Sequence, residues 1–274
     1  MTGLLLRLAG PLQSWGERSA FTPMRDTAGF PTRSGLIGMF AAAQGLARGA
    51  SLNQYDALEI TVRIDRPGVL LTDYHTVGGG MPTHLTAATS GGKNKGAAVI
   101  TRRQYLADAV FVAAVEGPGE QLGELADALR HPHWAPYLGR RSCPPDEPFL
   151  LRSDVNDPVA ELLTSVPLSR PHTDERRGPT PTPHPDHISV DVLWEHPPSG
   201  TSTPAIPLTV QDRPLTFAQH GRSHGKRRLY RTTEQLPAGL LHPEERTLHE
   251  RLVDYAAQDT TAGAPYPQST EHTA

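Results

Sequence analysis

The chain has 274 residues, a length typical of about two domains. Of these residues 37% are hydrophobic, which is enough for a packed core. Its formal net charge of -3 argues against a surface dominated by positive charge. The single cysteine excludes a disulfide framework and CxxC-type zinc or redox sites, and no apolar run approaches the roughly 20 residues that a bilayer span requires. We therefore expect a cytoplasmic protein that uses no metal or other cofactor.

Hydrophobic patterning predicts six elements in the first 152 residues. In residues 58–65, apolar side chains alternate with Glu59, Thr61, Arg63 and Asp65, which indicates a half-buried strand with these four side chains on its outer face. The predicted elements are a strand at 4–8, a helix at 32–48, strands at 58–65 and 108–116, a helix at 119–130 and a strand at 148–152. Thr32 or Ser34 is the expected N-cap of the first helix, and Gly49 its stop.

This order is that of an α+β, ferredoxin-like (RRM-type) fold, in which both helices cover one face of the sheet. We expect the other face to be left for a ligand. The predicted domain thus covers residues 1–152. It contains a long insertion at about 74–101 that is rich in glycine and carries Lys93 and Lys95. Connections of this length are usually functional or mobile, so the insertion is a candidate binding arm.

The second half of the chain differs in composition. Residues 153–187 read as a proline-rich linker, and residues 188–250 as a small β-rich region with strands near 188–194 and 206–210. Residues 251–274 are expected to form a disordered tail. Between Arg213 and Arg231 there are six basic residues and no acidic one, with Tyr230 interleaved. Such a cluster is typical of a phosphate-binding surface, although a solvated loop fits it equally well.

Five motifs in this order carry a resemblance to a known family. They are LRLAGPLQSWG, FPTRSGLIGMFAAAQG, DYHTV, TRRQYLADAVF and PYLGRRSCP, and they cover residues 3–150 densely. The chain resembles the Cas-five family of CRISPR-associated proteins within the RAMP superfamily, in particular its CasD-type subunits of type I-E Cascade. Five ordered motifs are far more specific than one glycine signature.

The resemblance implies a non-catalytic RNA-binding subunit in antiviral defence. Such a subunit holds the 5′ handle of the CRISPR RNA (crRNA), caps the backbone filament of Cascade and extends the inserted arm as a thumb over the guide. The implied partners are the crRNA 5′ handle, the backbone subunit CasC, the large subunit CasA, the other Cascade subunits and, through the complex, target DNA. No membrane partner is implied.

The candidate RNA-binding residues lie mainly in the family motifs and in the basic cluster. The start of the first helix offers free backbone N–H groups to a phosphate, with Arg33 beside them. An ordinary capped helix explains the same segment. Of Arg140 and Arg141, adjacent in a stiff turn, we expect one to face RNA and the other to brace the turn. The full set is Arg25, Thr32, Arg33, Ser34, Tyr74, His75, Lys93, Lys95, Arg102, Arg103, Arg140, Arg141, Arg222, Lys226, Arg227 and Arg228.

Other classes of function fit the sequence less well. The pair His220 and His224 has the spacing of two metal ligands on a helix, but the glycines around it disfavour a helix and no carboxylate follows. The sequence contains no GxxxxGK[ST] nucleotide-binding loop and no visible helix-turn-helix or zinc finger. A metal-independent endoribonuclease that processes repeat RNA remains the alternative, with Tyr74 and His75 as acid-base groups.

Overall fold

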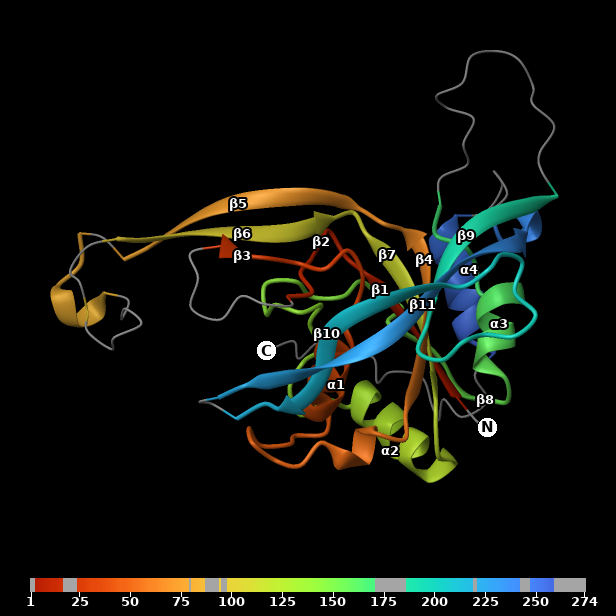
Figure 1. Cartoon of the computed structure of the whole chain (residues 1–274), viewed down its shortest axis with the longest axis horizontal. Coiled ribbons are helices and arrows are strands. Elements are labelled where there is room, and N and C mark those ends of the chain that lie inside the picture. Colours follow the sequence, from red (N-terminus) through yellow and green to blue (C-terminus); the bar gives the residue numbers. More distant parts are fainter. Residues whose placement is uncertain are drawn as a thin grey trace, which may run out of the picture.

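The centre of the molecule is a seven-stranded sheet with the order β10-β11-β9-β4-β7-β1-β8 (Figure 1). The computed structural model describes residues 3–16, 24–78, 80–86, 94, 98–170, 186–218, 221–241 and 247–258. Each pair of neighbours in this sheet is antiparallel. The strands are β1 (Gly3–Ala9), β4 (Glu59–Arg66), β7 (Val110–Glu116), β8 (Leu150–Val155), β9 (His187–Trp194), β10 (Ile206–Thr216) and β11 (Ser223–Pro237).

The six elements predicted for the first 152 residues are confirmed. Helix α1 (Arg33–Ala43) connects β1 to β4, and α2 (Gly119–Arg130) connects β7 to β8. Thr32 is the N-cap of α1, and its hydroxyl accepts the backbone N–H of Gly35. The helix ends at Ala43, before the predicted stop at Gly49, because Gly45 takes a left-handed conformation (φ +74°) that terminates it.

Both faces of the central strands are covered, so the prediction of an open second face is wrong over β1, β7 and β8. Helices α1 and α2 pack on one face. On the other, Leu5 and Val112 belong to a second core with α3 (Pro158–Thr164) and α4 (Leu248–Ala256). The strands carry apolar side chains on both faces, and burying both faces stabilises the fold. Arg63 and Asp65, predicted to face solvent, are fully buried on this second face.

The predicted boundaries after residue 152 also change. The stretch predicted as a linker contains the end of β8 and all of α3, whose N-cap is Asp157 with Pro158 in the first turn. Helix α4 begins with a capping box made by Thr247 and Glu250 and continues to Ala256, inside the stretch predicted as a disordered tail. Residues 171–185 and 259–274 lie outside the described residues.

The predicted insertion lies at the end of a long two-stranded ribbon that extends away from the sheet (Figure 1). Its strands are β5 (Val69–Val77) and β6 (Val99–Ala107), and a 3-10 turn, η2 (Thr83–Leu85), lies near its end. Strand β6 also pairs with β2 (Leu12–Gln13) at the root of the ribbon and with β3 (Met24–Arg25) near the middle of the ribbon. The arm therefore begins and ends several residues outside the predicted 74–101.

The ribbon continues the central hairpin β4–β7 across a sharp junction. Gly68 (φ +75°) and Asp108 (φ +57°) are both left-handed there. A Cβ atom on Gly68 would lie 2.7 Å from the Cβ of Ala109, so only glycine fits. Arg66 and Asp108 form an ion pair of 2.8 Å across the junction. The geometry of the junction therefore depends mainly on Gly68.

The C-terminal strands extend the same sheet, because β9 pairs with β4. The strand predicted near 188–194 is confirmed, and the one predicted at 206–210 continues to Thr216. The hairpin β10–β11 projects beyond the sheet on the same side as the ribbon in the view of Figure 1. The remaining short turns are η1 (Asn53–Tyr55) and η4 (Ala238–Leu240). None of the described helices is long and apolar enough to cross a membrane.

Candidate nucleic-acid interface

Three arginines lie together where β3 pairs with the ribbon. Arg25 of β3 lies opposite Arg103 of β6 in a parallel pair. Arg140, from the turn after α2, donates through Nη2 to the carbonyl oxygen of Arg25 (3.3 Å). Its guanidinium also lies over the ring of Tyr105, 4.7 Å from the centroid, a cation–π contact. Arg25, Arg103 and Arg140 are called the ribbon-base cluster below.

The turn that carries Arg140 is rigid. Gly139 is left-handed (φ +84°), and a Cβ atom there would lie only 1.8 Å from the carbonyl oxygen of Ser14. Two backbone hydrogen bonds close the turn, from Leu138 to Cys143 (2.7 Å) and from Cys143 to Arg140 (2.9 Å). Arg140 ties this turn to β3, and Arg141 is exposed. Which of the two faces RNA stays a prediction. Cys143 is buried, as predicted, and burial raises the pKa of its thiol.

Two donors of the cluster are unsatisfied within the described part of the chain. Nη1 of Arg140 and Nε of Arg103 are buried and have no hydrogen-bond partner there. A buried polar group without a partner costs free energy, and more so when it is charged. Phosphate oxygens are acceptors that suit guanidinium donors in number and in charge. The cluster therefore has the chemistry of a phosphate site.

The side chains of the ribbon divide between its two faces. Tyr74 of β5 lies opposite Arg102 of β6, and both are exposed. His75 is on the other face, where its Nε2 lies 2.5 Å from a carboxylate oxygen of Asp73. The ribbon thus offers an aromatic ring and a cation on the Tyr74 face. Lys93 and Lys95, predicted on the same arm, lie outside the described residues.

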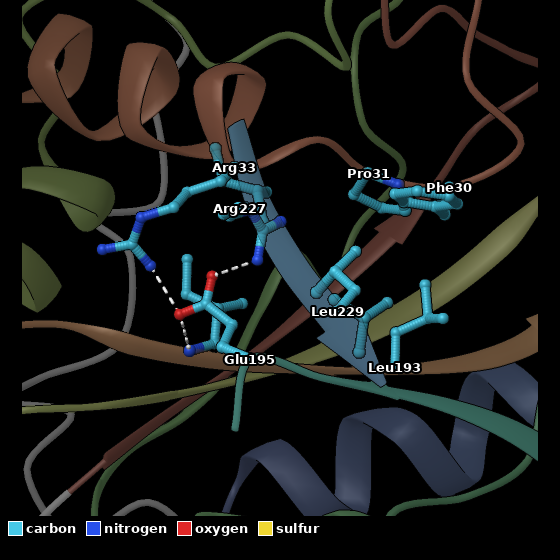
Figure 2. A pocket seen from close by; sticks show the side chains of 10 residues that line it. Phe30, Pro31, Arg33, Leu193, Glu195, Arg227 and Leu229 are labelled. Atoms are coloured by element: carbon cyan, nitrogen blue, oxygen red, sulfur yellow. Dashed lines mark hydrogen bonds and ion pairs between the residues drawn. The ribbon is translucent and has the colours of Figure 1, made fainter. Parts of the chain in front are cut away.

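Arg33 is held by partners within the protein (Figure 2). Its Nη1 donates to Glu195 (2.6 Å), and its Nη2 donates to the carbonyl oxygens of Tyr55 (2.8 Å) and Leu58 (2.9 Å). Its backbone N–H, at the start of α1, donates to Asp212 (2.7 Å). A carboxylate therefore already occupies the positive end of this helix, and Thr32 and Ser34 are buried beside it. The ordinary capped helix is the interpretation that these contacts support.

Arg227 belongs to the same network, although the sequence predicted it as an RNA contact. It donates to Asp212 through Nε (2.5 Å) and Nη2 (2.8 Å), and to Glu195 through Nη1 (2.8 Å). Arg33, Glu195, Asp212 and Arg227 are called the buried ion network below. The two acids escaped sequence analysis because they lie far along the chain from Arg33, and no local pattern marks them.

The other basic residues of β10–β11 are exposed. Lys226 and Arg228 flank Arg227 on the strand, and Arg222 lies over the ring of Phe217, 5.5 Å from its centroid. Arg213 lies 3.5 Å from Asp56. Burial and, to a smaller extent, the charge of Arg222 hold the pKa of His224 below its usual value, which favours the neutral ring. Among the described residues there is no group of three or more metal-ligating side chains.

The fold is that of an α+β protein dominated by one sheet, from which a long two-stranded ribbon extends. The chain belongs to the Cas5 family: the family described as "CRISPR-associated protein (Cas_Cas5)" matches residues 3–230. "CRISPR system Cascade subunit CasD" of Escherichia coli (strain K12) is 38% identical over 186 residues, which are 60% of this chain and 77% of that protein.

Two solved structures are similar along most of this chain. One is a chain of a "CRISPR RNA-guided surveillance complex", with 44% identity and a TM-score of 0.79, over 93% of this chain and 100% of that one. The other is described as "Crystal structure of Cas protein", with 29% identity and a TM-score of 0.58, over 89% of this chain and 100% of that one.

Proposed function

We propose that this chain is the non-catalytic RNA-binding subunit of a type I-E CRISPR Cascade surveillance complex. In this role it holds the 5′ handle of the crRNA and caps the backbone filament. The similarity to the Cascade subunit CasD and to a chain of an RNA-guided surveillance complex supports membership of such a complex. Its proposed partners are the crRNA, CasC, CasA, the other Cascade subunits and, through the complex, target DNA.

The single observation that carries the RNA-binding role is the ribbon-base cluster. Three arginines from separate segments lie together there, and donors of two of them, Arg103 and Arg140, are buried without an acceptor in the described chain. Arginine is the side chain best suited to phosphate recognition, because its planar fork can donate two parallel hydrogen bonds. Arg141 and Arg102, both exposed, add charge near this point in the sequence.

We further infer a ferredoxin-like RAMP core within residues 1–152, with the ribbon as its thumb. The strand order β4-β7-β1-β8, with α1 and α2 in the crossovers, supports this finer description. We also propose that residues 188–250 form a β-rich unit added to that core, since β9 joins it through β4.

The alternative, an RNA-cleaving enzyme, is less well supported. Tyr74 and His75 are neighbours on β5, so their side chains point to opposite faces of the ribbon. One scissile phosphate could not meet both groups. His75 instead pairs with Asp73 on its own face. The proposal therefore assigns no catalytic residue.

The test measures handle-RNA affinity against salt concentration for Arg140→Ala, Arg103→Ala and Arg141→Ala. Each lost phosphate contact should flatten the log–log slope by about 0.7 for a single strand. Arg140→Lys should keep most of the slope but bind more weakly, because an ammonium cannot reproduce the fork. Arg48→Ala, an exposed cation near the end of α1, is the control. Unchanged slopes in all three alanine variants would refute the assignment.

A further inference from the structure

Strand β11 divides its run of basic residues between two faces. Successive side chains of a strand point to opposite sides, so Arg227 faces α1 and the buried ion network, while Lys226 and Arg228 face away. Both outward side chains are exposed, and neither has an ion pair with another described residue. Residues of a strand that share a face are about 7 Å apart. Lys226 and Arg228 thus form the start of a regularly spaced row.

Aromatic side chains continue this row. Tyr230 is the next residue of β11 on the outward face, and it lies directly opposite Trp194 of β9. Residues directly opposite each other share a face, so the two rings are neighbours beside Arg228. Trp194 donates through its indole N–H to the hydroxyl of Thr232 (2.9 Å), which orients the ring, and both aromatic residues are partly exposed.

The neighbouring strand adds no negative charge. Thr209 of β10 lies opposite Arg228, and Pro207 lies opposite Tyr230. Asp212, the acid of β10, points inward to Arg33 and Arg227. The outer hairpin face, defined here as Lys226, Arg228, Tyr230, Trp194 and Thr209, therefore combines exposed cations with two aromatic rings on one surface.

The inner face of the same hairpin fixes this surface in place. Arg227 joins β11 to Asp212 of β10 and to Glu195 at the end of β9, and Glu195 in turn accepts from Arg33 of α1 (Figure 2). A preorganised surface loses less conformational entropy when it binds a ligand. The hairpin therefore presents its outer face rigidly, although it projects beyond the sheet.

We propose that the outer hairpin face is a second contact surface for single-stranded RNA, separate from the ribbon-base cluster. This inference rests on the proposed function, which supplies RNA as the ligand. Aromatic rings on a sheet surface stack with unpaired bases, and flanking cations neutralise the backbone, largely regardless of sequence. A base-paired duplex cannot offer its bases to Tyr230 and Trp194, so single strands are selected.

The test uses the full chain and a labelled 20-nucleotide polyuridylate, a probe that lacks any handle sequence. The double variant Lys226→Ala/Arg228→Ala should weaken binding about tenfold or more and flatten its salt dependence. Tyr230→Ala should weaken binding at least fivefold with an unchanged salt slope, since it removes stacking and no charge. Arg231→Ala is the matched control, because Arg231 lies on the same strand but on the other face, paired with Asp191. It should bind like the wild type.

Tryptophan fluorescence gives an independent measurement. In a Trp134→Phe background, which removes the exposed indole, the RNA strand should quench the emission of Trp194. Thr209→Glu, which places a carboxylate opposite Arg228, should weaken binding while the fold melts as before. Wild-type affinity in the double variant, absence of quenching, or tighter binding of duplex RNA or of single-stranded DNA would each overturn the inference.

The two proposals can be refuted independently of each other. If the outer-face variants bind normally while the ribbon-base variants lose handle RNA, only the further inference is wrong. If the ribbon-base variants keep the handle while the outer-face variants lose polyuridylate, the ribbon-base assignment is wrong and the outer face stands. If no variant in either set changes RNA binding, the proposed RNA-binding function itself is refuted.

Discussion

At the scale of single residues, identical side chains have different roles according to the direction in which the backbone points them. Arg227 is part of a buried network, whereas Lys226 and Arg228 beside it are exposed. Arg33 was predicted to bind phosphate, and its donors are instead used by Glu195 and two carbonyl groups. Sequence identifies a basic residue near a helix start, but it does not show which acid from elsewhere in the chain reaches it.

Replacement of Arg33 by alanine tests its structural role. The side chain of Arg33 is 9% exposed and that of Glu195 is 10% exposed. Arg33→Ala should lower the free energy of unfolding by about 3 kcal/mol, because it removes one of the two guanidiniums that pair with Glu195 and takes a donor from the carbonyl groups of Tyr55 and Leu58. Urea unfolding measures this, with Arg48→Ala as the control for an exposed arginine. Unchanged stability together with weaker RNA binding would instead favour the original prediction.

At the scale of elements, periodicity and capping patterns correctly predicted the helices and strands that are determined by local sequence. The two helices of the N-terminal half, the cap of α1 by Thr32 and the strand after it follow from periodicity and capping chemistry. Helices α3 and α4 were missed, because the first is short and both are stabilised by contacts with a distant sheet. Their presence explains why Arg63 is buried: its Nη1 and Nη2 donate to carbonyl oxygens of Val166 (3.0 Å) and Pro167 (3.1 Å), just after α3.

The junction of the ribbon is an element whose geometry depends on one glycine. Gly68→Ala should destabilise the protein by more than about 1 kcal/mol, because the new methyl group adds a clash with Ala109 to the cost of φ +75°. Gly80→Ala is the matched control: its φ is +68°, but no atom lies within 4 Å of the added Cβ. Thermal unfolding of the two variants separates steric from backbone cost. Equal melting temperatures would contradict the tight junction.

At the scale of the whole molecule, one sheet carries two projecting hairpins, the ribbon β5–β6 and the hairpin β10–β11 (Figure 1). The ribbon-base cluster lies where β3 pairs with the first, and the outer hairpin face is on the second. The sequence indicated both regions, through the length of the glycine-rich insertion and the basic run after Arg213. It could not show that a two-stranded ribbon carries the insertion, because the two strands pair across a gap of more than 20 residues.

Shortening the ribbon tests whether it acts as a thumb. Val77 pairs with Val99, so residues 78–98 can be replaced by Asn-Gly, the preferred two-residue hairpin turn. The described core clusters contain no side chain from the deleted segment, so the melting temperature should stay within a few degrees of the wild type. The shortened chain should keep the ribbon-base cluster and its affinity for short handle RNA, yet fail to join a stable Cascade when co-expressed with the other subunits and a crRNA.

The control for this variant replaces the same segment by a glycine-serine linker of equal length, which preserves reach but removes the native side chains. Assembly by the shortened chain would refute the thumb role, and assembly by the linker control alone would show that length, and not sequence, is what the complex requires.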